Sequence, residues 1–144
     1  MSEENHYRKL ERMYVHARCN EYYAPHITVT KGTAEVIVPV KADFFHAAHA
    51  VHGSVYFKML DDAGFFAANS LVLDYLVLTT SFTLYFLKPI TSGELRATGK
   101  VVHSSKRLFI SECSLCNSEN MEIARGSGTF IQSVIKLTPE IGYI

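Results

Sequence analysis

Two adjacent carboxylates, Asp61 and Asp62, interrupt the most apolar stretch of the sequence. Residues 53–72 contain no proline and carry apolar side chains on almost every side, which is typical of a buried helix. Lys58 lies three and four residues before these carboxylates, and one lysine can neutralise only one of them. The other carboxylate is costly in apolar surroundings unless another group pairs with it or a functional site solvates it. These residues leave a structural ion pair and a functional carboxylate equally open as interpretations.

The residues His52, Gly53 and Ser54 stand immediately before this apolar stretch, at the expected start of the helix. Glycine has no side chain, so another molecule can approach the backbone closely there. The unpaired N–H groups of a helix N-terminus carry a partial positive charge and can bind a carbonyl oxygen that develops into an oxyanion. The alternative interpretation is an ordinary helix cap with Gly53 or Ser54 in the capping position.

Helix and strand patterns on both sides of this stretch indicate an α+β fold. Residues 5–18 carry a helical stripe of apolar side chains, and residues 26–40 predict a hairpin whose second strand ends at Pro39 or lies at a sheet edge. Four more strands are expected, at residues 77–87, 94–103, 107–116 and 121–134. Because the connections are short, these strands should form an antiparallel meander.

A helix that is apolar on every side needs a curved sheet around it, because a flat sheet covers only one side. We therefore expect one domain over residues 1–144, in which a curved antiparallel sheet wraps around a central buried helix and an N-terminal helix is added. One flank of the central helix, or one face of so small a sheet, would still stay uncovered. Self-association is the natural way to cover it, so at least a homodimer is expected.

Composition and charge exclude several classes of protein. Of the 144 residues 48% are apolar and 19% are charged, and 14 basic side chains balance 14 acidic ones. This balance gives no reason to expect nucleic acid or an anionic membrane surface, and no apolar run approaches the roughly 18 residues of a membrane span. The N-terminus has no apolar signal core and the three cysteines form an odd set, which together favour the cytoplasm.

Cys113 and Cys116 form a C-x-x-C pair of the kind found in metal sites. No two further ligands have matching spacing, and in a strand the two thiols point to opposite faces. The histidines and carboxylates form no metal motif such as H-E-x-x-H. We therefore expect buried free thiols, with no metal and no cofactor.

The segment H-G-S-V-Y-F-K-M-L-D-D-A resembles the H-G-G…D signature of hotdog-fold acyl-CoA thioesterases of the phenylacetate-degradation (PaaI-like) type. The similarity runs from about Phe45 to Phe130 and includes an L-K-P-I-x-x-G segment that starts at Leu87, followed by S-K-R and A-x-G-x-G-T-F segments. The resemblance implies a hotdog fold and hydrolysis of an acyl-CoA thioester. We expect a homo-oligomer, either a homodimer or a dimer of dimers (homotetramer), with the dimer of dimers favoured.

The same resemblance assigns roles to five positions. The acidic residue that the family carries on the central helix corresponds to Asp61, eight positions after the first glycine, Gly53. The second glycine of the signature is Ser54 here, which costs some backbone freedom. The Asn or Gln that helps to hold the thioester carbonyl is replaced by His46, which can still donate a hydrogen bond. A hydroxyl that steadies the attacking water falls at Thr79.

Spacing separates Gly53 from Asp61 along the expected helix. Eight residues correspond to about 12 Å along the axis and about 80° around it. One thioester carbon must lie roughly 3 Å from each group that acts on it, so it cannot contact both groups of one helix. If both act, they come from different subunits and the site lies at a dimer interface, which is the arrangement that the resemblance also implies.

The expected mechanism is thioester hydrolysis, in which the N–H of Gly53, aided by His46, polarises the carbonyl and Asp61 acts as general base or as nucleophile. Partial burial would raise the pKa of Asp61 and make it a better base. Thr79 would position the water, and an ordinary β-branched strand residue is the alternative. Its strand alternates small polar residues with apolar residues that are expected in the core, namely Leu78, Phe82, Leu84 and Phe86.

Coenzyme A carries phosphates, so cations should line the entrance to the site. Lys106 and Arg107 occupy a turn between two expected strands, where charge and exposed backbone suit phosphate contact; a solvated turn is the alternative. His52 and Ser54, at the start of the helix, are the other expected substrate contacts.

Two other functions remain open from the sequence. A hydratase or dehydratase that acts on acyl thioesters would need a histidine base, and His46, His49 and His52 keep that possibility open. A non-catalytic oligomer would bind acyl-CoA or lipid without turnover, and changes at Asp61 would alter no rate.

Overall fold

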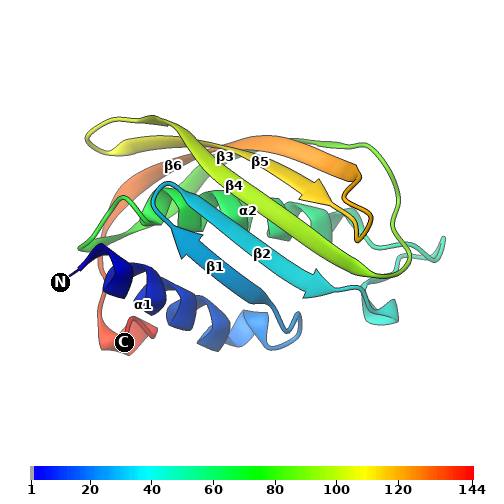
Figure 1. Ribbon diagram of the computed structural model, residues 1–144, viewed down its shortest axis with the longest axis horizontal. Helices are drawn as coiled ribbons and strands as arrows, with labels where there is room; N and C mark the ends of the chain where they lie inside the picture. Colours follow the sequence, from blue (N-terminus) through cyan, green and yellow to red (C-terminus); the bar gives the residue numbers. More distant parts are fainter. Residues whose placement is uncertain (1) are drawn as a thin grey trace.

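The computed structural model describes residues 2–144, which form two α-helices and a six-stranded sheet (Figure 1). The helices are α1 (Glu3–His16) and α2 (Gly53–Asn69). The strands are β1 (His26–Thr30), β2 (Thr33–Pro39), β3 (Tyr75–Phe86), β4 (Glu94–Ser104), β5 (Leu108–Cys116) and β6 (Glu122–Lys136). Every expected helix and strand is confirmed, with ends that differ by a few residues. No helix within residues 2–144 combines the length and the apolarity needed to cross a membrane.

The strands lie in the order β1-β2-β4-β5-β6-β3, and all neighbours are antiparallel. The expected meander is therefore wrong for β3, which lies beside β6 at the far edge and not beside β4. A short connection usually joins neighbouring strands, but residues 87–93 cross from one half of the sheet to the other past the start of α2. There the N–H of Val51 donates to the carbonyl of Ile90 at 3.0 Å.

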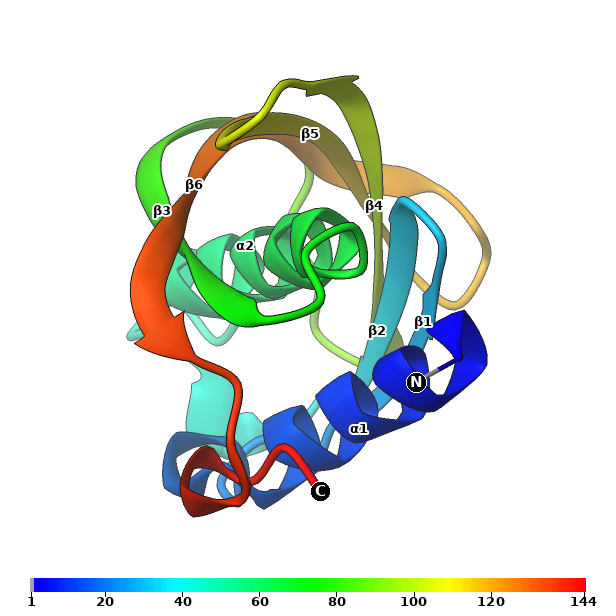
Figure 2. The ribbon, with the colours of Figure 1, turned by 90° about the vertical axis from the view of Figure 1, so that its left-hand side faces the viewer.

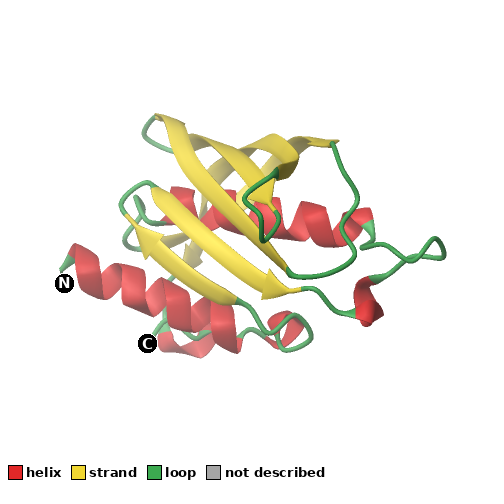
Figure 3. Ribbon diagram, turned by 45° about the vertical axis from the view of Figure 1, so that its right-hand side comes forward, coloured by secondary structure: helices red, strands yellow, loops and turns green. Residues whose placement is uncertain are grey.

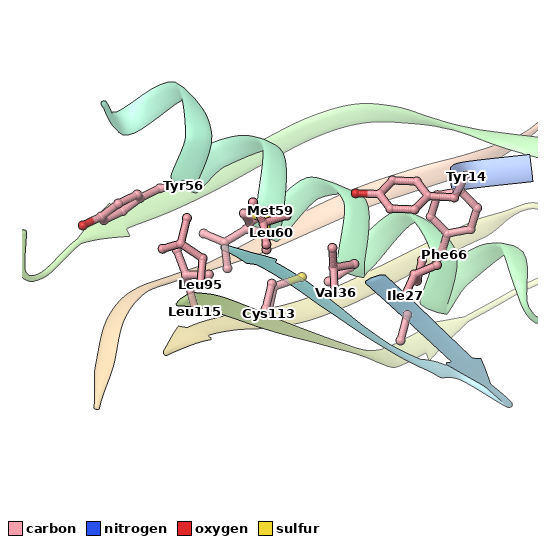
Figure 4. Close-up of a cluster of buried hydrophobic side chains, with 14 of the residues drawn as sticks. Tyr14, Ile27, Val36, Tyr56, Met59, Leu60, Phe66, Leu95, Cys113 and Leu115 are labelled. Carbon is pink, nitrogen blue, oxygen red and sulfur yellow. The ribbon is translucent and has the colours of Figure 1, made fainter. Parts of the chain in front are cut away.

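The sheet curves around α2, and Figure 2 shows β4, β5, β6 and β3 arching over the helix. Contact with β4 is so close that a Cβ at Gly99 would lie 2.5 Å from the backbone of Ala63. Met59 and Leu60 lie between α2 and the strands that carry Leu95 and Leu115 (Figure 4). The curved antiparallel sheet around a central buried helix is thus confirmed.

One flank of α2 stays uncovered in the single chain, as expected. This open flank carries Gly53, Phe57, Asp61 and Phe65, four residues apart from one another, and none of them is fully buried. Phe57 is the most exposed apolar side chain of the helix, at 39%. The fold therefore presents the candidate carboxylate where α2 meets β3, at the edge of the sheet, which covers this flank only in part.

The helix α1 lies along β1 and closes that edge of the sheet (Figure 3). Glu11 Oε2 accepts a hydrogen bond from the N–H of Val29 at 2.8 Å, and Arg8 Nη2 donates to the carbonyl of Val29 at 2.7 Å. These bonds occupy backbone groups that an added strand would need. The outer edge of β3, which pairs only with β6 among the described strands, is therefore the edge available to another strand.

The C-terminal residues pack against α1 and the end of α2. The hydroxyl of Tyr143 lies 2.7 Å from Nδ1 of His6, and Nε2 of the same ring lies 2.9 Å from the carbonyl of Asn69. A carbonyl can only accept, so Nε2–H donates to it and Nδ1 accepts from the tyrosine. Burial lowers the pKa of His6, consistent with this neutral ring that joins three elements.

Candidate active site

Asp61 is held by one hydroxyl, and no cation within residues 2–144 pairs with it. Thr79 Oγ1 donates to Asp61 Oδ1 at 2.8 Å, and Oδ2 accepts no hydrogen bond within residues 2–144. Burial raises the pKa of Asp61; the hydrogen bond from Thr79 and the charge of Lys58 oppose this, while the charge of Asp62 adds to it. The side chain is thus a desolvated carboxylate with one oxygen free to act.

A β-bulge in β3 turns Thr79 toward this carboxylate. Thr79 pairs with Phe130 and Ser81 pairs with Thr129, so Thr80 is an extra residue on β3. An extra residue shifts the alternation of side chains by one position beyond it. Thr79 and Phe82, which simple alternation would put on opposite faces, therefore share one face.

The expected alternation of this strand is wrong before the bulge, where Leu78, an expected core residue, is 41% exposed. Phe86, also expected in the core, keeps the face of Phe82 and Leu84 but is 58% exposed, because it lies at the end of the strand against the start of α2. Phe82 and Leu84 do pack on the core, and the bulge places Thr79 on their face of β3. A bulge leaves no mark in an alternating pattern, so the sequence predicts the wrong face for Thr79.

Asp62, the neighbouring carboxylate, is neutralised within the chain. Lys58 Nζ lies 2.8 Å from Asp62 Oδ2, and the hydroxyl of Tyr14 donates to the same oxygen at 2.6 Å. Burial raises the pKa of Asp62, while the charge of Lys58 and both hydrogen bonds oppose the change. The expectation that Lys58 pairs with only one carboxylate is confirmed, and Tyr14 is a partner that sequence analysis missed.

Gly53 is the first residue of α2, and its backbone amide is unused. The helix cap is His52, whose Nδ1 accepts from the N–H of Ser54 at 3.0 Å and lies 2.8 Å from its hydroxyl. Capping by Gly53 or Ser54 is therefore wrong, because the His52 ring takes that role. The N–H of Gly53 donates no hydrogen bond within residues 2–144 and stays available to a ligand oxygen.

His46 and Gly53 line one pocket of about 370 Å³. The N–H of Ala48 donates to Nδ1 of His46 at 3.0 Å, so in the neutral ring the proton is on Nε2, which can then donate to a ligand. Lys88 lines the same pocket and is its cation. The structure thus brings together two hydrogen-bond donors that suit a carbonyl oxygen.

Lys106 and Arg107 occupy the β4–β5 turn, at the opposite end of α2 from Gly53. Lys106 lines a depression of about 490 Å³ together with Leu71, just beyond the end of α2. Arg107 Nη2 donates to the carbonyl of Gln132 at 3.2 Å. Within one chain these two cations therefore do not reach the pocket of Gly53.

One chain also keeps the carboxylate and the amide apart. Asp61 does not line the pocket that His46 and Gly53 share, and it lies two helical turns farther along α2. Both groups nevertheless face the same open flank. A second molecule that covers this flank would touch both.

The two thiols of the C-x-x-C pair differ in burial and direction. Cys113 is buried at 4% exposure, as expected, but Cys116 is half-buried, because it points to the outer face at the end of β5. The burial pattern of β5 confirms that the two thiols point to opposite faces. Among residues 2–144 no three His, Cys, Asp or Glu side chains gather as a metal site requires.

Comparison with known proteins finds relatives in sequence and in fold. A family model described as the thioesterase superfamily matches residues 48–124, from the segment before α2 into β6. A Saccharolobus solfataricus protein named as an esterase, SSO2140, is 24% identical over 104 residues, which cover 72% of this chain and 74% of that protein.

Two solved structures show the likeness in fold. PaaI of E. coli, from the phenylacetic acid degradation operon, matches with a TM-score of 0.85 and 22% identity over 94% of this chain and 99% of PaaI. Thioesterase HI1161 of Haemophilus influenzae matches with a TM-score of 0.77 and 15% identity over 85% and 87% of the two chains. The chain therefore belongs to the thioesterase superfamily, a family of thioester hydrolases, and has the hotdog fold of PaaI.

Proposed function

We propose that the protein hydrolyses acyl-CoA thioesters to a free acid and CoA, at a site that joins Asp61 of one protomer to Gly53 of the partner subunit. The contrast between the two carboxylates carries this proposal. Asp62 is neutralised by Lys58, whereas Asp61 is desolvated, has only a hydroxyl partner and lies on the open flank. Since such a carboxylate costs folding free energy, a catalytic role accounts for its position.

The donors and the carboxylate fit the steps of thioester hydrolysis. The thioester carbonyl oxygen accepts from the N–H of Gly53 and from Nε2–H of His46, which stabilise the charge that develops on it. Asp61 takes a proton from water as the water oxygen bonds to the carbonyl carbon. The C–S bond then breaks, and the CoA sulfur receives that proton. Thr79 holds one carboxylate oxygen, which leaves the other free to act.

The second route to the same products uses Asp61 as a nucleophile. Its free oxygen attacks the carbonyl carbon and expels CoA as a thiolate, which forms a mixed anhydride. Water then hydrolyses the anhydride and restores the carboxylate. Both routes require the ionised form of Asp61.

The exposed edge of β3 supports pairing with a second copy of this chain. Tyr85, Phe86 and Leu87 are 63%, 58% and 50% exposed at the end of this strand and just beyond it. A cluster of large exposed apolar side chains marks an association surface. Because α1 closes the other edge of the sheet, an antiparallel β3–β3 contact about a two-fold axis is the pairing that fits.

The spacing on α2 supports the same dimer. A two-fold axis perpendicular to α2, as the antiparallel β3–β3 contact implies, makes the two copies of the helix antiparallel. If Asp61 then lies opposite Gly53 of the partner subunit, the residue midway between the two positions lies opposite its own copy. That residue is Phe57, whose exposed ring the partner would cover.

The spacing on β3 is compatible with the same axis. Thr79 contacts the carboxylate, and Phe86 lies against the start of α2. An antiparallel ladder that places Thr79 opposite Phe86 of the partner subunit puts Phe82 next to the axis. Phe82 and Phe57 already meet, with ring centroids 5.6 Å apart, so helix and strand agree on one dimer.

The proposed dimer would bring the cations of the β4–β5 turn toward the site. Antiparallel helices bring the end of one α2 near the start of the other, so Lys106 and Arg107 approach the partner's side of the site. Replacing both by alanine should raise KM for an acyl-CoA by about tenfold, because contacts with phosphate are lost. KM for the matching N-acetylcysteamine thioester, which lacks the nucleotide, should stay unchanged. Equal increases for both substrates would contradict phosphate contact.

The pH dependence should report the ionisation of Asp61. Because burial raises its pKa, kcat/KM should fall on acidification at a pH above the ordinary aspartate range. Thr79→Val removes a hydrogen bond that lowers this pKa, so the acid limb should move to higher pH, as a pH–rate profile would show. Thr98→Val, the same change on the exposed outer face, is the control and should leave the limb in place.

Release of free CoA thiol from a series of acyl-CoA substrates tests the proposed function directly. Steady turnover that is lost on changing Asp61 supports hydrolysis. Hydration of crotonyl-CoA without thiol release would instead identify a hydratase. Binding of acyl-CoA without any turnover would identify a binding protein, and either result contradicts the proposal.

A further inference from the structure

Two phenylalanine rings meet on the open flank beside the catalytic candidate. Phe57 precedes Asp61 by one helical turn, and Phe82 lies on β3 on the same face as Thr79. The two rings contact edge to face, with an interplanar angle of 87°. Since Phe57 is 39% exposed, the pair presents an apolar surface next to the carboxylate that has no cover in the single chain.

The ring of Phe82 packs against two glycines of β6. Gly128 pairs with Phe82 across the ladder, and a Cβ there would lie 2.5 Å from Cδ2 of the ring. A Cβ at Gly126 would lie 2.8 Å from Cε1 of the same ring. The ring thus rests on the β6 backbone, and any side chain at either position would push it away. This contact gives the glycines of the A-x-G-x-G-T-F segment a physical role.

We propose that Phe57 and Phe82 form the wall against which the acyl group lies, and that this wall sets the longest acyl chain the site accepts. The inference rests on the proposed thioester hydrolysis. Lys106, which is expected at the CoA end, lies beyond the C-terminal end of α2, while Phe57 lies on the N-terminal side of Asp61. The acyl group therefore extends from the carboxylate toward the two rings, and CoA extends the other way.

Leucine at either ring position should open the site. The ratio of kcat/KM for decanoyl-CoA to that for butyryl-CoA should rise by about tenfold in Phe57→Leu and in Phe82→Leu. Gly128→Ala should act in the opposite direction, because the new methyl group pushes the Phe82 ring into the site. The matched control is Phe65→Leu, one turn beyond Asp61 on the other side, which should leave the ratio unchanged.

The outcomes separate this inference from the proposed function. Wild-type protein that releases no thiol from any acyl-CoA contradicts the function itself. If the protein hydrolyses acyl-CoA but both leucine variants keep the wild-type chain-length ratio, the proposed acyl wall is wrong while the proposed function stands. An equal rise of the ratio in Phe65→Leu would have the same meaning. Light scattering follows the oligomeric state of each variant in parallel. If one leucine variant dissociates, the chain-length ratio of the other variant tests the proposal. Dissociation of both variants would show that the rings serve the subunit contact instead, which overturns the wall.

Discussion

Replacing Asp61 by asparagine is expected to lower kcat by about a hundredfold or more while the oligomeric state stays that of the wild type. Asparagine keeps the size of the side chain and can still accept the hydrogen bond from Thr79. It can neither take a proton from water nor attack a thioester. Thiol release at saturating acyl-CoA measures the loss, and light scattering confirms the assembly.

The same substitution should stabilise the protein at neutral pH. Burial raises the pKa of Asp61, so the ionised side chain lowers the free energy of unfolding at every pH above that pKa. As the pH falls through the raised pKa, the folded protein takes up a proton here and the penalty disappears. Tm of Asp61→Asn should therefore exceed that of wild type at pH 7, and the gain should vanish below about pH 4. A lower Tm at pH 7 would contradict the description of Asp61 as an unpaired, desolvated carboxylate.

Asp62→Asn is the matched control. The change removes the counter-ion of Lys58 and weakens the bond from Tyr14, but it leaves Asp61 and its hydrogen bond from Thr79 in place. Its kcat should fall far less than that of Asp61→Asn. A larger loss of kcat in Asp62→Asn would transfer the catalytic role to Asp62.

Replacing Gly53 by proline should lower kcat/KM by about a hundred- to a thousandfold, because proline removes the N–H that the account assigns to the carbonyl oxygen. The helix should tolerate the change. Gly53 is the first helical residue, where proline is favoured, and the φ and ψ of His52, −64° and 143°, suit a residue that precedes proline. Initial rates and the circular dichroism spectrum would check both expectations.

Gly53→Ala separates the loss of the amide from the added side chain. Alanine keeps the N–H but, like proline, adds a Cβ that would lie 3.0 Å from the ring of Phe86. That ring is exposed and can shift, so the alanine variant should keep most of its activity. Equal losses in the two variants would show that crowding, and not the missing amide, is responsible.

Local patterns predicted the elements of this fold well, and the pairing of the strands less well. The apolar pattern of residues 53–72 and the proline at position 39 place α2 and the end of β2 correctly, because both depend on neighbours in the chain. The position of β3 beside β6 depends on a crossing past the start of α2. Connection length does not encode such a crossing, so the meander was the wrong choice for β3.

The candidate site was likewise predictable only where it depends on neighbours in the chain. The spacing from Lys58 limits the ion pairs to one carboxylate, but the choice of Asp62 also depends on Tyr14, which comes from another helix. The residues of α1 show only an amphipathic stripe, so no pattern in the sequence indicates this contact. The bulge at Thr80, which turns Thr79 toward Asp61, is equally invisible in an alternating strand.

The central claim is that one protomer supplies Asp61 and its partner supplies Gly53, and mixing two inactive variants tests it most directly. Asp61→Asn and Gly53→Pro subunits are unfolded together and refolded, so that about half of the dimers contain one of each. Each mixed dimer then has one site with both groups intact, and the mixture should recover about one quarter of the wild-type activity. Activity no greater than the sum of the two parent variants would show that a single chain holds the whole site.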